Sequence, residues 1–344
     1  MDKQQIPAIR LENISKSFGS IRANINVNLS VYRGEILAIL GENGSGKTTL
    51  MNMISGIYYP DSGRIYIDGE EAIIASPKDA FRYKIGMIHQ HFKLVDVFSA
   101  TENIMLGVDD GKKFSEKDAR AKVVEISEKY GFLIDPDKKI YQMSVSEKQT
   151  VEIVKVLYRG ADILILDEPT NHLDLETMDW LETYLKAYRG AVLVVSHDRY
   201  FLDSVCTRIW ELRGKTITTY RGNYSAYLPQ REAADERLQK QHDADVEKAA
   251  KLQDYIDRNL VRASTTKMAQ SRRKQLEKLE ITEAPKDETN QLKFRFEYDV
   301  EPWNELVLMK NLTIRIGERT LLEPFTYTVC RGQRLVIAGP NGAG

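Results

Sequence analysis

The sequence contains few cysteines, no long apolar run and almost no net charge. Cys206 and Cys330 are its only cysteines among 344 residues, and their separation matches no metal-ligand spacing, which argues against a zinc site or a disulfide framework. No apolar stretch approaches the roughly 20 residues of a membrane-spanning helix, so any membrane role would be peripheral. A formal net charge of −1 provides no overall basic field for nucleic acid. We therefore expect a protein of more than one domain in a reducing cytosol.

The stretch from Glu35 to Ile57 carries the clearest signal in the chain. An apolar, strand-like run at 36–40 is followed by a glycine-rich turn and then by a segment with helical spacing. The turn fits the phosphate-loop pattern of glycine, four residues and Gly-Lys-Thr. Its residues are Gly41, Glu42, Asn43, Gly44, Ser45, Gly46, Lys47, Thr48 and Thr49.

Each residue type in this loop has a physical role at a bound phosphate. Glycines let backbone N–H groups curl around phosphate oxygens at the positive end of the following helix. Lys47 can bring a positive charge to the β- and γ-phosphates, and the Thr48 hydroxyl can ligate Mg²⁺. A plain glycine-rich loop would rarely combine these features, so the sequence predicts a nucleotide site.

Two further apolar runs end in polar residues that suit the same site. Residues 161–166 read as a buried parallel strand that ends at Asp167 and Glu168. The carboxyl ends of such strands face the crevice where ligands bind, so Asp167 can hold Mg²⁺ through water and Glu168 can activate the attacking water. Residues 191–195 read as a third strand, followed by His197. A pair of acids is often only a helix cap, and a lone histidine is usually structural, but the upstream phosphate loop favours catalytic roles.

The regions around these strands complete the outline of the fold. Residues 8–34 alternate between apolar and polar positions, which predicts antiparallel strands. Residues 76–137 contain helical stretches that fit a helical insertion into an α/β core. Phe18 precedes the phosphate loop, where an aromatic ring could stack on adenine, although a single aromatic residue is more often part of a core.

These motifs occur in the order found in an ABC-type ATPase, which the chain resembles from residue 8 to about residue 225. The resemblance implies an α/β fold with a phosphate-loop core, an antiparallel β subdomain and a helical subdomain. It also implies ATP and Mg²⁺ as ligands. The shared motifs are the phosphate loop, the Gln90 region, Ser144 to Gln149, the Asp167–Glu168 pair and His197.

The resemblance assigns roles to individual residues of the site. It strengthens the interpretation of Phe18 as a ring that stacks on adenine. It implies that Gln90 touches both the metal and the attacking water, with Thr48 and Asp167 as the other metal ligands. It also implies that His197 contacts the γ-phosphate, beside Glu168 as the group that activates water.

The signature segment departs from the family pattern. In the family this segment acts in trans, at the nucleotide of a second nucleotide-binding domain, which would here involve Ser144, Ser146 and Gln149. The usual sequence is Leu-Ser-Gly-Gly-Gln, whereas this chain has Met143-Ser144-Val145-Ser146-Glu147, and Thr150 stands where arginine is usual. Ser146 places a β-carbon where backbone must approach a γ-phosphate. We therefore expect weak closure and slow turnover.

The resemblance changes along the chain. Residues 8–170, with Gly86-Met87-Ile88-His89-Gln90-His91-Phe92, look like the ATP-binding subunit of a nucleoside or simple-sugar importer. Residues 171–344, with Ser196-His197-Asp198-Arg199-Tyr200-Phe201-Leu202-Asp203, look like ABC-F proteins, which are tandem-domain, ribosome-associated ATPases. Such a mosaic is either a natural recombinant or a joining error in the source sequence. An importer subunit would pair with transmembrane subunits at the membrane, whereas an ABC-F protein would be cytoplasmic.

Residues 228–282 differ in character from the preceding part, because strand patterns disappear and charged residues become frequent. Apolar spacing predicts a long helix and a returning helix, which together form a two-helix arm. A charge-rich stretch of this kind is usually a solvated linker. Its predicted tip at 258–274 contains no acid, and the arm resembles the ABC-F interdomain linker, which implies contact with ribosomal RNA. The candidate RNA contacts are Arg258, Arg262, Lys267, Arg272, Arg273 and Lys274.

The end of the chain repeats its beginning at a constant offset. A linker at 283–304 therefore leads into the start of a second nucleotide-binding domain at 305–344, which we expect to be truncated one residue before its lysine. Ile316 takes the place that Phe18 has in the first copy. The matching segments are Glu12-Asn13-Ile14 with Lys310-Asn311-Leu312, Arg33-Gly34-Glu35 with Arg331-Gly332-Gln333, and 41–46 with 339–344.

The sequence leaves three functions open. The arm and the second-domain start favour an ABC-F-like ATPase that acts on ribosomes. Gln90 and its surroundings favour the ATP-binding subunit of an importer. The incomplete second site favours a fragment that binds ATP without a productive cycle of hydrolysis.

Overall fold

The computed structural model describes residues 6–90, 92–108, 115–132, 134–171, 173–213, 216–259, 266–279, 282, 284, 303–317 and 319–336. The chain divides into two units, which are Met1–Tyr224 with Pro302–Gly344, and Ser225–Glu301. Within the described residues, no helix combines the length and the apolar character that crossing a membrane requires.

An antiparallel sheet forms the first part of the chain, as the alternation of residues 8–34 predicts. Its strand order is β2-β1-β4-β5. Apolar residues of β1 such as Ile9 and Leu11 are buried on one face, while their neighbours remain partly exposed. The strands are β1 (Ile9–Phe18), β2 (Ile21–Val31), β4 (Ser62–Ile67) and β5 (Glu70–Ala72).

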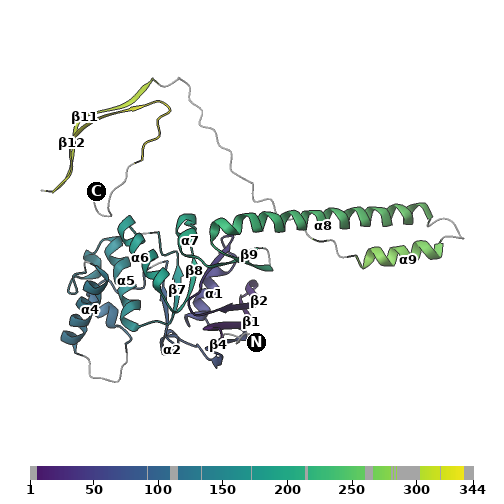
Figure 1. Ribbon diagram of the computed structural model, residues 1–344, viewed down its shortest axis with the longest axis horizontal. Helices are drawn as coiled ribbons and strands as arrows, with labels where there is room; N and C mark the ends of the chain where they lie inside the picture. Colours follow the sequence, from purple (N-terminus) through teal and green to yellow (C-terminus); the bar gives the residue numbers. More distant parts are fainter. Residues whose placement is uncertain are drawn as a thin grey trace. The chain divides into compact units, whose positions relative to one another are not determined.

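A mostly parallel sheet carries the motifs, with the order β10-β9-β3-β8-β7-β6. Figure 1 labels β7, β8 and β9 of this sheet. Strands β6 to β9 and β3 run parallel, and β10 is antiparallel to β9. Every residue of β7 and β8 is buried, as expected for strands covered on both faces. The carboxyl ends of β3, β7 and β8 therefore meet at one edge. The strands are β3 (Ile36–Gly41), β6 (Ile85–Ile88), β7 (Ile163–Asp167), β8 (Ala191–Val195), β9 (Arg208–Arg213) and β10 (Thr216–Arg221).

Helices follow these strands, and a helical insertion lies between β6 and β7. The predicted range of 76–137 was wrong at both ends, because it includes α2 and β6 and stops before α5. The insertion has its own small core, which includes Ile104, Val123 and Val154. Serine side chains at Ser99 and Ser144 cap two of its helices through capping boxes. The helices are α1 (Lys47–Ile54), α2 (Pro77–Arg82), α3 (Ala100–Met105), α4 (Glu116–Tyr130), η1 (Ile140–Gln142), α5 (Val145–Arg159), α6 (Leu175–Ala187) and α7 (Arg199–Val205).

The second unit contains the predicted two-helix arm. Helix α8 (Tyr224–Asn259) is followed by α9 (Thr266–Glu277), which runs back beside it (Figure 1). The Arg272 guanidinium lies 5.9 Å from the centroid of the Tyr255 ring. Further along, the Thr282 N–H and hydroxyl both donate to the carboxylate of Asp245, at 3.2 and 2.7 Å. These side-chain contacts hold the returning segment against α8.

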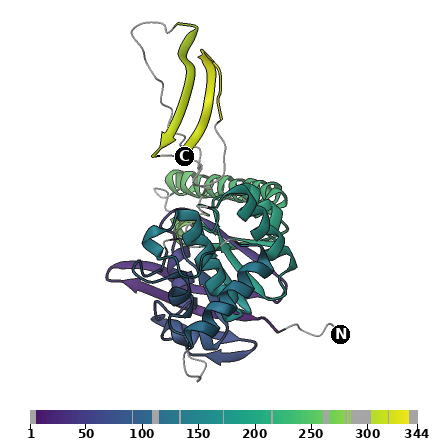
Figure 2. The ribbon, with the colours of Figure 1, turned by 90° about the vertical axis from the view of Figure 1, so that its left-hand side faces the viewer.

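A second hairpin, β11 (Glu305–Ile316) and β12 (Arg319–Cys330), forms a twisted two-stranded ribbon (Figure 2). Its register repeats that of β1 and β2 at the offset found in the sequence. The bulges recur as well, because the shifts beside the Leu312–Phe325 pair match those beside the Ile14–Val27 pair.

Backbone geometry repeats with the register. Asn13 and Asn311 both lie in the left-handed region, with φ values of 52° and 51°. Each backbone N–H donates to a side chain on the partner strand, that of Asn13 to Asn28 at 3.0 Å and that of Asn311 to Thr326 at 3.1 Å. The second hairpin therefore repeats the first two strands in structure as well as in sequence, including this backbone conformation and hydrogen bond.

Candidate nucleotide-binding site

The phosphate loop connects β3 to α1, and its glycines have conformations that other residues rarely adopt. Gly44 and Gly46 have φ values of 82° and 95°. A β-carbon at Gly46 would lie 2.9 Å from Nδ2 of Asn24 and would overlap the carbonyl oxygen of Ala23. Glycine is therefore required at position 46, and the lack of side chains at Gly44 and Gly46 leaves the loop backbone accessible to a ligand.

Lys47 is folded back onto the loop. Its ammonium group donates to the carbonyl oxygens of Gly41 at 2.7 Å and of Glu42 at 2.9 Å, and the residue is only 8% exposed. Burial lowers the pKa of Lys47, while the nearby carboxylates of Glu168 and Asp167 act in the opposite direction. A phosphate group would give this desolvated cation a charged partner in place of neutral carbonyls.

Glu168 occupies a strained turn at the carboxyl end of β7. Its φ of 52° is uncommon for a residue with a side chain, and such a conformation costs on the order of 1 kcal/mol or more. The backbone N–H of Glu168 donates to the carbonyl of Val195 at 2.8 Å, which ties this turn to the end of β8. Asp167 and Glu168 are 3% and 8% exposed, so both acids are buried at the edge of the sheet.

His197 contacts Glu168 directly, which the sequence does not specify. The His197 backbone N–H donates to Oε2 of Glu168 at 3.2 Å, and its ring Nε2 lies 3.3 Å from Oε1. Both oxygens of the carboxylate are therefore oriented by one residue. The His197 side chain is 65% exposed, so its ring remains accessible to a ligand.

One pocket of about 500 Å³ gathers most of the predicted residues. Gly41, Glu42 and Ser45 belong to the same loop but do not line this pocket. The Ser45 hydroxyl is buried and has no hydrogen-bond partner among the residues that the structure describes. The predicted residues that line the pocket are Phe18, Asn43, Gly44, Gly46, Lys47, Thr48, Thr49, Gln90, Asp167, Glu168 and His197.

The donors around this pocket fit Mg-ATP. Thr48, Gln90 and Asp167 offer only oxygen ligands toward it, and Mg²⁺ prefers such ligands. The glycine cradle fits a phosphate chain. These residues would hold the nucleotide and the metal.

Phe18 is the aromatic residue that lines the pocket, and it contacts Tyr58, which lies beside the pocket lining and was not expected from the sequence. The ring of Phe18 is 42% exposed and meets Tyr58 edge-on, with centroids 5.2 Å apart. Arg22 and Asn171 also line the pocket. Tyr58 follows α1 without any motif, and strand alternation at Arg22 indicates only an exposed side chain, so the sequence contained no signal that placed these residues at the site.

The signature residues do not line the pocket. Ser144 is exposed at the start of α5 and Ser146 is half-buried, whereas Gln149 is only 3% exposed. The Gln149 amide donates to the carbonyl of Pro169 at 3.5 Å, beside Glu168. Gln149 therefore faces its own domain, and action in trans stays a prediction for this segment.

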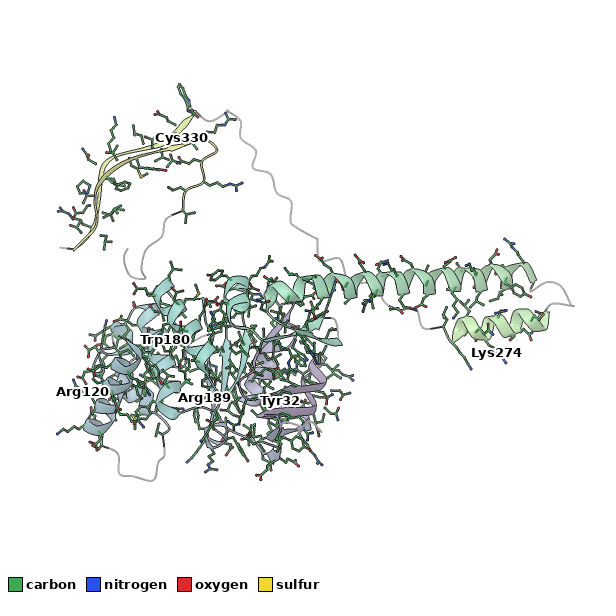
Figure 3. All side chains as sticks on the ribbon, in the orientation of Figure 1. Tyr32, Arg120, Trp180, Arg189, Lys274 and Cys330 are labelled. Atoms are coloured by element: carbon green, nitrogen blue, oxygen red, sulfur yellow. The ribbon has the colours of Figure 1, made fainter. Side chains whose placement is uncertain are left out.

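The predicted RNA contacts lie on the arm and are partly paired with acids that flank the predicted tip. Arg258 pairs with Asp254 at 2.9 Å, and Arg273 pairs with Glu277 at 3.3 Å. These side chains remain more than half exposed, so the pairs are weak and the cations stay accessible. Figure 3 shows Lys274 on α9. Arg262 and the side chain of Lys267 lie outside the described residues.

Family comparisons identify the type of domain. Residues 25–171 match the family model described as ABC transporter, and residues 210–296 match a second model with the same description. The chain contains an ABC-type ATPase domain. The family resemblance expected from the motifs is thereby confirmed.

Relatives of both predicted kinds are present. The chain is 35% identical to the putative ATP-binding protein YdiF of Bacillus subtilis, over 98% of this chain and 56% of that protein. It is 44% identical to the nucleoside import ATP-binding protein NupA of Lactococcus lactis, over 61% and 43%. It is 31% identical to the ABC transporter F family member 2 of Arabidopsis thaliana, over 98% and 54%. The chain thus spans about half the length of these relatives.

A solved structure confirms the predicted fold class. The chain resembles a dimeric bacterial ABC transporter cassette with a TM-score of 0.55 and 28% identity. The match covers 62% of this chain and 98% of that cassette. The α/β core with an antiparallel sheet and a helical insertion is therefore the fold of an ABC ATPase cassette.

Proposed function

We propose that residues 8–225 bind and hydrolyse Mg-ATP in the pocket between Lys47 and Glu168. The observation that carries this proposal is the convergence of the phosphate loop, the paired acids, Gln90 and His197 on one cavity from distant parts of the sequence. Convergence of a phosphate cradle, oxygen ligands for a metal and an oriented carboxylate is what phosphoryl transfer to water requires.

The chemistry is in-line attack of water on the γ-phosphate. Glu168 orients the water and accepts its proton, since its buried carboxylate is held by the His197 backbone N–H. Lys47 exchanges its carbonyl partners for phosphate oxygens and stabilises charge that develops on them. Mg²⁺, when bound, polarises the phosphate oxygens as a Lewis acid. Because the signature segment departs from the family pattern, we expect slow turnover of ATP.

The partner proposed for Ser144 and Ser146 is a second nucleotide-binding domain. Their position at the first turn of α5 leaves them accessible to another domain. We assign the start of such a domain to 305–344, after the arm at 228–282 and a linker at 283–304. The β11–β12 hairpin supports this assignment, because it repeats β1–β2 in register and bulges.

The finer proposal is an ABC-F-like ATPase that is cytoplasmic and associates with ribosomes through the arm. The arm carries exposed cations, whereas the net charge of the whole chain is only −1. The positive charge is therefore concentrated locally, on the arm. The similarity to an ABC transporter F family member over 98% of this chain includes the arm, which supports the same function.

Replacing Arg272, Arg273 and Lys274 by alanine is expected to weaken ribosome binding and its dependence on salt. Cations that contact phosphates release counterions, so the log–log salt slope should flatten by about two to three units, or about 0.7 to 0.9 for each contact. The measurement is co-sedimentation with ribosomes across a salt series, with ATP present and Glu168→Gln holding the nucleotide.

A matched variant tests whether position matters in addition to charge. Arg237, Lys240 and Lys248 are exposed cations of α8 that lie before the predicted tip. Replacing these three by alanine removes the same charge and should leave most of the slope intact. Absence from the ribosome pellet at low salt, or equal slopes for both triple variants, would remove the ribosome assignment while leaving the ATPase proposal untouched.

The identity of 44% to a nucleoside import protein supports a second candidate, the ATP-binding subunit of an importer. Such a subunit would act at the membrane with transmembrane partners and would need no basic arm. The ribosome experiment separates the two candidates. Binding of ATP without phosphate release would instead favour the third function, an ATP-binding fragment.

A further inference from the structure

A second cavity, of about 130 Å³, shares no lining residue with the nucleotide pocket. It lies among the last residue of α4, helices α5 and α6, and strands β6 and β7. We name it the seam cavity. Its main lining residues are Tyr130, Ile153, Leu157, Trp180, Tyr184 and Tyr188.

Aromatic rings form one wall of the seam cavity in a defined arrangement. Trp180, labelled in Figure 3, stacks on Tyr184 with centroids 5.2 Å apart and an interplanar angle of 12°. Tyr130 meets both rings edge-on, at 6.0 Å from Trp180 and 5.8 Å from Tyr184. Ring faces and edges are thus already ordered, which is the arrangement that a further aromatic ring would join.

The cavity is also a weakly polar environment. Burial raises the pKa of Tyr184 to about 12 and raises the pKa of Tyr188 as well. The Tyr188 hydroxyl already donates to the carbonyl of Ala161 at 2.5 Å. Among the described residues, no aspartate, glutamate, lysine or arginine lines the cavity. An uncharged occupant is therefore favoured over a charged one.

The two sides of the cavity come from parts of the chain with different resemblances. Tyr130 and Leu157 belong to the part that resembles importer subunits, and Trp180 and Tyr184 belong to the part that resembles ABC-F proteins. Close packing requires matched shapes, and the seam cavity marks a place where the packing between these two parts is incomplete. The void is bounded by aromatic and aliphatic surfaces on both sides.

We propose that the seam cavity is a binding site for a small, planar, uncharged aromatic molecule of the size of benzene. An apolar cavity of about 150 Å³ takes up benzene in another protein, and the seam cavity has a similar volume, with aromatic lining residues that are partly exposed. A ring in the cavity would contact Trp180 and Tyr184 and would gain dispersion contacts there. The occupant would join α4 and α5 to α6, so it would stabilise the domain.

The test uses benzene and the full chain. At ten times its dissociation constant, benzene should raise the melting temperature by about 3–6 °C. Leu157→Phe should raise the melting temperature without ligand and abolish the benzene shift, because the larger ring occupies the cavity. Leu175→Phe places the same change on an exposed residue of α6 and should leave the shift intact. Tyr184→Phe, which keeps the ring, should also preserve it.

If Leu157→Phe does not fold, a measurement on the unmodified chain still tests the proposal. Fluorobenzene in the presence of the chain should show enhanced ¹⁹F transverse relaxation, and added benzene should reverse the enhancement. Lys47→Ala should give the same result, since the two cavities share no residue. No relaxation enhancement at millimolar fluorobenzene, or an equal benzene shift in Leu157→Phe and Leu175→Phe, would overturn the proposal.

Discussion

Glu168→Gln is expected to reduce ATP turnover by about 100-fold to 10,000-fold while leaving Mg-ATP binding nearly unchanged. The amide keeps the shape of the carboxylate and can still occupy the strained turn beside His197, but it cannot accept a proton from water. Phosphate release measures turnover, and titration with a fluorescent ATP analogue measures binding.

Glu176→Gln is the matched control for this substitution. Glu176 lies exposed in the first turn of α6, so the same chemical change there should leave phosphate release at the level of the unmodified chain. If Glu168→Gln also releases phosphate at that level, Glu168 is not the group that activates water.

Lys47→Ala is expected to weaken Mg-ATP binding by about 100-fold. The ammonium group donates two hydrogen bonds within the loop, and two charge-assisted bonds transferred to phosphate contribute about 3 kcal/mol. The backbone nest is formed by glycines and stays in place, so the loss reports the charge itself. Titration with a fluorescent ATP analogue gives the affinity.

Lys84→Ala provides the comparison for Lys47→Ala. Lys84 is largely exposed and pairs with Asp162 at 3.3 Å, and it does not line the nucleotide pocket. Its removal should leave the affinity for ATP within about twofold, because exposed ion pairs contribute little and act locally. Equal affinities for the two variants would show that the nucleotide binds somewhere other than at the phosphate loop.

The sequence predicted the elements of the site because their chemistry is local. The spacing of glycines, lysine and threonine predicts the phosphate loop. An apolar strand that ends in two acids predicts that Asp167 and Glu168 lie at the edge of the sheet. The edge of the parallel sheet then brings these segments together. The same reasoning predicted the two helices of the arm, since apolar spacing alone defines them.

Other features depend on tertiary contacts that no spacing encodes. The positive φ of Glu168 and its contact with His197 follow from the way β7 and β8 end side by side. Gln149 turns toward Pro169 because α5 buries that face, so its motif position alone was not informative about its orientation. By contrast, the ion pair of Arg273 with Glu277 joins residues four apart on one helix, a spacing that predicts such pairs.

The number of ATP molecules bound per chain tests the nucleotide site most directly. Equilibrium dialysis of Glu168→Gln with labelled ATP and Mg²⁺ avoids loss of the ligand by hydrolysis. The structure predicts saturation at about one ATP per chain, and at an ATP concentration ten times the dissociation constant, adding Lys47→Ala should lower the occupancy to about a tenth. Failure to bind ATP, or saturation that is unaffected by Lys47→Ala, would contradict the assignment of this pocket.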